Sequence, residues 1–301
     1  MALNVATLKT RSLTAVVFVA VMLTGLLWNS TSFLILFIIV HFGCWLEYLK
    51  LVEKIYAVTI DVVIKWFFAI CGFTLLIILG IHNVTYDAGI IIANFEISFK
   101  LLCWFLLFIL LLVFIFQNKV LSSKVKWMCF GGFVYITMPI IMMVDMRSIW
   151  NDFEGFKTLS DFGSTIPVAI IFSIWINDTM AYIVGSLIGK TPFSKISPKK
   201  TWEGTIGGAI LAVLVMGFLF PILADKYFYP FAQPKTWFII AALCAIFGTI
   251  GDLFESKLKR MANVKDSGSI MPGHGGFLDR FDSLLFAAPA VWVYVKIFVA
   301  G

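Results

Sequence analysis

The sequence predicts an all-α polytopic membrane protein with about nine transmembrane helices. Hydrophobic residues make up 61% of the 301-residue chain and charged residues only 13%. The mean hydropathy of +0.98 is far above the range of soluble domains. Apolar stretches approaching the length of a bilayer span, about 20 residues, recur along the chain. Tryptophans mark the edges of several stretches, as expected where a helix leaves the lipid.

Nine segments are candidate spans, with ends defined to within several residues. The first two are short and are separated only by Trp28, Asn29 and Ser30, which predicts a helical hairpin. We divide the chain into N-terminal transmembrane helices, residues 1–144, and a C-terminal region, residues 145–301, that carries the polar motifs. The nine segments are Leu13–Leu27, Thr31–Leu46, Trp66–Ile81, Leu101–Phe116, Trp127–Val144, Ile166–Ile188, Thr205–Ala224, Trp237–Leu253 and Leu284–Val299.

Lys and Arg are distributed unevenly between the two sides of this arrangement. If the N-terminus is cytosolic, seventeen of the 23 lie in cytosolic segments and six lie in outside segments. The positive-inside rule therefore predicts a cytosolic N-terminus and a C-terminus on the outside. The same arrangement places two polar loops, residues 189–204 and 251–283, in the cytosol.

The N-terminal half is chemically quiet. Its spans are apolar on all sides, and its few polar groups stand near the expected span ends. We interpret these groups as polar residues at the membrane interface: His41, Glu47, Glu53 and Asp61.

Residues 251–283 form the most densely charged stretch. Ionisable groups at a membrane boundary are costly, so such a stretch indicates a functional site by default. A solvated interfacial loop is the alternative, but it does not explain the glycines. The stretch holds five cations, one of the three histidines and five carboxylates, namely Asp252, Glu255, Asp266, Asp279 and Asp282.

Helical spacing divides this stretch into two polar faces and a loop. If the eighth span continues as a helix, Asp252, Ser256 and Lys259 fall on one of its faces. Asp279 and Asp282 share one face of the first turn of the ninth helix. Between them, the glycines of Pro272–Gly276 exclude a helix and allow the backbone to approach a ligand closely.

Two polar motifs precede this stretch. Asn177 and Asp178 stand inside an apolar span, where an aspartate needs a charged partner, a metal or an interhelical hydrogen bond. Further along, paired lysines are followed by glycines that could hold phosphates at a helix N-terminus, although the order is not that of a P-loop. Taken alone, such lysines are more often topology determinants. This second motif comprises Ser197, Lys199, Lys200, Thr201, Glu203, Gly204, Gly207 and Gly208.

The combined residue types favour a metal-dependent reaction on phosphates. Clusters of carboxylate oxygens select Mg²⁺ rather than zinc, and the five cysteines lack metal-ligand spacing. Interleaved lysines and arginines would neutralise phosphates, which suggests phosphoryl or nucleotidyl transfer. His274 could act as a general base or hydrogen-bond a phosphate or the backbone. We prefer the second role, since a phosphate nucleophile is already ionised at pH 7.

The motifs together resemble a known family. Ser256–Lys–Leu–Lys–Arg260, Lys265–Asp–Ser–Gly268, Pro272–Gly–His–Gly–Gly276 and Asp279–Arg–Phe–Asp282 resemble the signature of phosphatidate cytidylyltransferases, the CDP-diacylglycerol synthases. Upstream, the likeness extends to Asn177–Tyr182 and Ser197–Gly204. It therefore covers most of residues 177–283, whereas the N-terminal half is similar mainly in its hydrophobic layout.

This resemblance implies an enzyme of phospholipid biosynthesis that transfers the cytidylyl group of CTP to phosphatidic acid, giving CDP-diacylglycerol and pyrophosphate. It implies a bacterial inner-membrane protein with a cytosolic active site and no nucleic acid partner, and it allows a homodimer. It also implies a two-metal Mg²⁺ site, with K⁺ allowed at one position.

The resemblance carries roles onto matching residues. The implied catalytic residues are Asp252, Asp279, Lys259, Arg260 and Asp266. The implied metal ligands are Asp252 and Asp279, then Asp282 and Asp178. The implied substrate-binding residues are Asn177, Asp178, Ser197, Lys199, Lys200, Thr201, Glu203, Ser256, Lys265, His274, Gly275, Gly276 and Arg280.

Two other functions fit parts of the pattern. A CTP-dependent synthase or kinase acting on another lipid, such as an isoprenoid phosphate, would need similar chemistry. A transporter could line an ion path with Asp178, Asp252 and Asp279. Transport predicts charges near the bilayer midplane in two related halves, whereas here the charges gather at one face and no repeat is evident.

Overall fold

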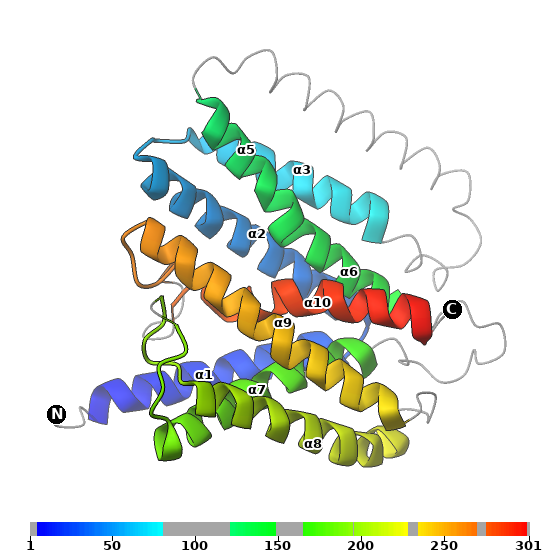
Figure 1. The fold of residues 1–301 in the computed structure, drawn as a ribbon. Helices are drawn as coiled ribbons and strands as arrows, with labels where there is room; N and C mark the ends of the chain where they lie inside the picture. Colours follow the sequence, from blue (N-terminus) through cyan, green and yellow to red (C-terminus); the bar gives the residue numbers. More distant parts are fainter. Residues whose placement is uncertain are drawn as a thin grey trace, which may run out of the picture.

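All regular structure in the described part of the chain is helical. The computed structural model describes residues 5–80, 121–148, 165–194, 196–227, 234–269 and 275–299. Within these ranges there is no strand beyond one isolated bridge between Pro192 and Thr201. The helices run roughly side by side in a bundle (Figure 1). They are α1 Val5–Leu27, α2 Ser30–Tyr56, α3 Val62–Gly80, α5 Ser123–Gly132, the short π-helix η2 Phe133–Thr137, α6 Met138–Ser148, α7 Thr165–Ile188, α8 Trp202–Tyr227, α9 Pro234–Met261 and α10 Leu278–Phe298.

Seven of these helical segments are long and apolar enough to cross a membrane, with α5, η2 and α6 forming one continuous rod. An eighth, Thr14–Leu27, is apolar but shorter. Eight of the nine segments predicted from sequence therefore coincide with helices, and Leu101–Phe116 lies outside the described residues. The all-α membrane class is confirmed, while the total of nine spans stays a prediction.

The predicted N-terminal hairpin is present. Asn29 caps α2 by accepting a 2.7 Å hydrogen bond from the backbone N–H of Ser32, and the Ser32 hydroxyl accepts from the Asn29 N–H at 3.1 Å. This reciprocal cap fixes the start of α2 directly after the turn. Across the hairpin, a Cβ on Gly25 would lie 2.7 Å from the Leu36 side chain, so the two helices approach closely there.

Helix α2 forms the centre of the N-terminal helices. Trp45 is fully buried and stacks on Phe68 of α3, with ring centroids 6.0 Å apart. Its indole N–H donates to the Thr137 hydroxyl at 3.0 Å, and His41 lies 3.2 Å from the same oxygen. His41 is fully buried, so it is part of the helix packing and is not a solvated side chain.

Glycines bring the C-terminal helices together. A Cβ on Gly208 of α8 would lie 2.6 Å from the backbone nitrogen of Ala181 in α7, and one on Gly204 would lie 2.7 Å from the Ala181 carbonyl. In lipid, small residues permit such close helix contacts. These glycines therefore serve helix packing in the structure, whereas the sequence suggested a phosphate-binding turn.

The two polar loops share one end of the bundle. The loop between α7 and α8 and the stretch after α9 both lie at the end where α1 begins (Figure 1). This arrangement brings together motifs that are about 80 residues apart in the sequence. The candidate site is therefore sought at this end of the bundle.

Candidate active site

Helix α9 carries the first part of the site beyond its apolar segment. It continues to Met261, so the predicted placement of Asp252, Ser256 and Lys259 on successive turns is confirmed. Helix α10 begins at Leu278, which puts Asp279 in its first turn. The carboxylate-bearing ends of two helices thus face the same region.

Lys259 links the two helices. Its ammonium group lies 2.6 Å from Oδ1 of Asp279 and also pairs with Glu255, one turn earlier on α9. The Glu255 side chain is fully buried, and Lys259 is 15% exposed. Because an unpaired buried carboxylate is strongly unfavourable, Lys259 is required to hold this pair of acids in place.

Asp279 organises the loop before α10. Its Oδ2 accepts hydrogen bonds from the backbone N–H groups of Ser267 and Gly276, both at 2.8 Å. The Ser267 hydroxyl lies 2.9 Å from the same oxygen. Gly275 has φ +83°, and a Cβ there would lie 2.6 Å from this carboxylate. A glycine at position 275 therefore satisfies both the backbone conformation and the close contact.

Glu47 of α2 reaches the same loop from the N-terminal half. One carboxylate oxygen accepts from the Phe277 N–H at 3.0 Å, and the other accepts from the Leu278 N–H at 2.9 Å. The second oxygen also lies 2.7 Å from the Ser267 hydroxyl. With 3% exposure, Glu47 is buried, so it holds a protein loop and is not a solvated side chain. The negative charge also suits the positive end of the α10 dipole.

Two motif glycines pack against this carboxylate. A Cβ on either Gly268 or Gly276 would overlap the Glu47 side chain. Sequence reasoning expected the glycines of Pro272–Gly276 to let the backbone approach a ligand, and in the structure one of them, Gly276, approaches Glu47 instead. A lone carboxylate inside an apolar run was the available signal, the same one that singled out Asp178.

A second ion pair lies beside the first. Lys200, from the loop before α8, is 2.6 Å from Asp252 of α9. Asp252 is within electrostatic range of Asp178 on α7 and of Asp282 on α10. Asn177, next to Asp178, is 6% exposed. Carboxylates from three helices therefore converge, flanked by Lys200 and Lys259.

The donor set of this cluster fits a magnesium ion. Its candidate ligands are all oxygens, which Mg²⁺ prefers. Oδ1 of Asn177 and Oε1 of Glu255 are buried and accept no hydrogen bond from described residues, whereas Oε2 of Glu255 pairs with Lys259. Within the same residues no group of three Asp, Glu, His or Cys side chains forms a ready metal cage. Magnesium usually keeps several waters and uses one or two carboxylates plus substrate phosphates, so a complete protein cage is not required.

The loop before α8 is shaped by its own predicted site residues. Glu203 accepts from the backbone N–H groups of Lys190 and Thr191 at 3.2 Å. The Thr201 hydroxyl accepts from the Gly204 N–H at 3.2 Å and so caps α8. These two residues hold the loop that points Lys200 at Asp252, while Lys199 is exposed.

The remaining predicted residues lie around the cluster or outside the description. The side chains of Arg260, Lys265 and Asp266 are exposed, as is Arg280 on α10. Ser197 and Ser256 are half-buried. His274 lies outside the described residues.

Comparison with known proteins shows the family of the chain. The profile of the Cytidylyltransferase family matches residues 9–298, nearly the whole chain. The chain belongs to the cytidylyltransferase family.

Individual cytidylyltransferases show how far the similarity extends. The phosphatidate cytidylyltransferase of Synechocystis is 33% identical over 224 residues, covering 67% of this chain and 70% of the relative. That of Thermotoga maritima is 43% identical over 139 residues, covering 46% of this chain and 51% of the relative. That of Bacillus subtilis is 41% identical over 150 residues, covering 48% and 53%. The chain thus spans about half the length of the Thermotoga and Bacillus relatives.

Membership in the cytidylyltransferase family gives a chemical reason for the mixed charges. A cytidylyl group is transferred from a nucleotide that carries a highly charged triphosphate, so cations and metal-binding carboxylates are needed together. The cluster described above holds carboxylates and lysines together at one end of an integral membrane protein.

Proposed function

We propose that this protein transfers the cytidylyl group of CTP to phosphatidic acid, releasing pyrophosphate and forming CDP-diacylglycerol. The observation that carries this proposal is the convergence of Lys200–Asp252 and Lys259–Asp279 at one end of a lipid-spanning bundle. At such a place, a nucleotide from water can meet a phosphate that is anchored in the bilayer.

In the proposed reaction, an oxygen of the lipid phosphate attacks the α-phosphorus of CTP. The bond from the α-phosphorus to the oxygen bridging to the β-phosphorus breaks, and its electrons leave with pyrophosphate. The attacking phosphate is ionised at neutral pH, so no general base is needed. Positioning and charge stabilisation then supply most of the rate acceleration.

The magnesium ligands in this proposal are Asp252 and Asp282, with Asp178 beside them. Asp279 would join through Oδ1, the oxygen that now pairs with Lys259. A bound magnesium pair, with K⁺ allowed at one position, would supply Lewis-acid stabilisation of the triphosphate and the leaving pyrophosphate. Glu255, which shares Lys259 with Asp279, would keep that lysine at the site when Asp279 releases it.

The surrounding cations and loops complete the proposed site. Lys200 and Lys259 would contact phosphates at its centre. Exposed cations would contact phosphates at its entrance: Lys199, Arg260, Lys265 and Arg280. His274, Gly275 and Gly276 would shape the nucleotide pocket.

We further propose nine spans with the N-terminus in the cytosol of a bacterial cell and the C-terminus across the inner membrane. The Lys and Arg distribution and the shared end of the two polar loops support this orientation. A cytosolic site suits CTP, and a homodimer is compatible with the exposed apolar helix faces.

The direct test uses purified full-length protein with Mg²⁺, labelled CTP and phosphatidic acid. Labelled CDP-diacylglycerol is the expected product. If folded protein forms none across several acyl lengths, with and without K⁺, the proposed function is wrong. Competition with an isoprenoid phosphate separates the neighbouring enzyme class, because preferential labelling of that lipid would contradict phosphatidic acid as substrate.

A further inference from the structure

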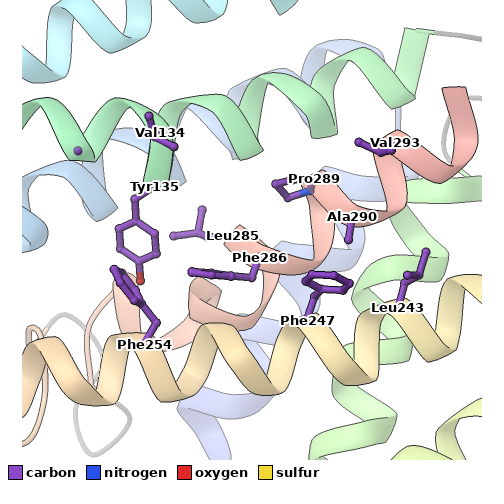
Figure 2. Close-up of a pocket in the computed structure, with 11 residues that line it drawn as sticks. Val134, Tyr135, Leu243, Phe247, Phe254, Leu285, Phe286, Pro289, Ala290 and Val293 are labelled. Atoms are coloured by element: carbon purple, nitrogen blue, oxygen red, sulfur yellow. The ribbon is translucent and has the colours of Figure 1, made fainter. Parts of the chain in front are cut away.

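An apolar cavity lies on another side of α9 from the Lys200–Asp252 pair. It occupies about 770 Å³ between the α5–η2 rod, α9 and α10 (Figure 2). Phe254 of α9 lines it, and Asp252 is two residues away. Since an α-helix turns 100° per residue, these two side chains point in nearly opposite directions. The cavity is therefore separate from the polar cluster, although both are built on the same helices.

One polar side chain stands at an end of this apolar cavity. Tyr135 of η2 is 8% exposed, and its hydroxyl is buried without a hydrogen-bond partner among the described residues. Figure 2 shows this hydroxyl directed toward Phe254, between α9 and α10. Buried Tyr hydroxyls normally have a partner. The Tyr135 hydroxyl is therefore a donor for which the described residues supply no acceptor.

The polar end of the cavity is also its closest approach to the carboxylates. Phe254 precedes Glu255, and Phe286 follows Asp282 by one helical turn. The opposite end is lined by Leu243 of α9. Eleven residues of helix separate Leu243 from Phe254, a rise of about 16 Å, or half of a hydrocarbon core of about 30 Å. The cavity thus extends from beside the site over a length equal to about half of that core.

The cavity is open to the surrounding lipid and shaped to receive a chain. Val134 is 73% exposed and Val293 is 46% exposed, both at its edge. Small residues, Gly131 and Ala290, leave room along the walls. An acyl chain can therefore enter sideways from the bilayer.

We propose that this cavity binds one acyl chain of the lipid substrate, with the Tyr135 hydroxyl donating to the ester carbonyl. A long apolar slot, a single donor at the head-group end and an opening to lipid match the chemistry of a fatty acyl ester. The volume lies within the usual 300–1,000 Å³ of ligand pockets. This inference rests on the proposed function, and it makes Tyr135 and Ala290 specificity-determining residues.

The test compares phosphatidic acids with dioleoyl and dihexanoyl chains. Ala290→Trp fills the cavity, so the ratio of kcat/KM for the long chain to that for the short chain should fall about tenfold relative to wild type. Ile210→Trp is the matched control, because Ile210 is 55% exposed on α8 and does not line the cavity. It should leave the ratio unchanged. An unchanged ratio in Ala290→Trp overturns the proposal.

Tyr135→Phe tests the hydrogen bond separately. Its kcat/KM should fall about three- to tenfold with diacyl phosphatidic acid, the value of one hydrogen bond. With the dialkyl ether analogue, which has no carbonyl, the variant and wild type should be equal. Equal losses on both lipids contradict a bond to the carbonyl.

Binding of radiolabelled dioleoyl phosphatidic acid without CTP keeps the inference testable if wild type makes no product. Ala290→Trp should then bind at least about fivefold more weakly than Ile210→Trp. Such a result would support the cavity while the proposed reaction failed. Equal binding, or a changed oligomeric mass of Ala290→Trp in detergent, would assign the cavity to another occupant and overturn the proposal.

Discussion

The two halves of this chain look very different in sequence but are joined at one carboxylate. The C-terminal half carries every recognisable motif, from Asn177 to Ser283. The N-terminal half is mainly apolar, yet Glu47 of α2 accepts hydrogen bonds from residues 220–231 positions further along the chain. The motifs therefore show where the sequence signature lies, but they do not include every residue that positions the loop before α10.

The halves also differ in how their polar groups are satisfied. In the C-terminal half, charged side chains pair with one another across helices, as in Lys200–Asp252 and Lys259–Asp279. In the N-terminal half, Glu47 holds backbone N–H groups of the other half. The charge pairs can exchange partners when phosphates arrive, whereas the bonds to Glu47, like those to Oδ2 of Asp279, fix the backbone of the loop before α10. We infer that the C-terminal half reacts and that α2 holds the reacting loop in place.

The largest effect is expected at the polar cluster. Asp252→Asn removes a proposed magnesium ligand and the partner of Lys200, so activity should fall at least about 100-fold. Initial rates at saturating Mg²⁺ measure this loss, and a thermal melt checks folding. Asp61→Asn is the control. Asp61 caps the start of α3 by accepting a hydrogen bond from the Val63 N–H, and it is distant from the motifs in the sequence. Near wild-type turnover in Asp252→Asn would contradict a role for Asp252 in the reaction.

Glu47→Gln should have the next largest effect. The amide group keeps the volume but presents N–H to the donors of Phe277 and Leu278, which misplaces the loop. Displacement of a reacting group by about 1 Å can lower the rate about 100-fold, so we expect kcat to fall about 10- to 100-fold. The assay is kcat at saturating CTP and lipid, per folded molecule.

Glu53→Gln is the matched control for that variant. Glu53 is also on α2 and accepts a 2.7 Å bond from a backbone N–H, that of Ile60, but it lies at the α2–α3 turn. It should lower the melting temperature without changing kcat. Parallel losses of kcat in both variants would show a general folding defect and would contradict a specific role for Glu47.

Gly276→Ala should have a smaller effect through the same contact. Its Cβ would overlap the Glu47 carboxylate, and overpacking costs about 1–3 kcal/mol of folding free energy. We expect a lower melting temperature and an activity loss below that of Glu47→Gln, because the carboxylate remains. Gly248→Ala is the comparison, since its Cβ would meet Ser283 at an ordinary 3.4 Å. Equal melting temperatures of the two variants would argue against tight packing at Gly276.

Thr137→Val should have the smallest effect. It removes the hydroxyl that accepts from Trp45 and contacts His41, which should lower the free energy of unfolding by about 1 kcal/mol. Turnover per folded molecule should not change, because this bond lies within the N-terminal helices. A selective loss of kcat would extend the functional region of that half beyond Glu47.

Local patterns in the sequence were sufficient for much of this structure. The spacing of Asp252, Ser256 and Lys259 was predicted correctly because helical periodicity is a short-range property. The hairpin at Asn29 and the position of Asp279 in the first turn of a helix followed from similar local signals. Hydropathy predicted the spans for the same reason.

Contacts between distant segments could not be derived in this way. Nothing near Glu47 indicates that its partners are Ser267, Phe277 and Leu278. Nothing near Gly208 indicates that Ala181 packs against it. The pairing of Lys200 with Asp252 depends on how α8 and α9 cross. The Tyr135 cavity likewise depends on three separated segments. In each case tertiary packing, rather than composition, decides which group becomes the partner.

The most direct test of the account is a structure of the full-length protein with Mg²⁺ and a non-hydrolysable CTP analogue in lipid. The account predicts the triphosphate between Lys200 and Lys259, metal density against Asp252 and Asp282, and Glu47 still bound to the backbone of Phe277 and Leu278. A triphosphate bound elsewhere, with the two lysine–aspartate pairs intact and no metal beside them, would contradict it.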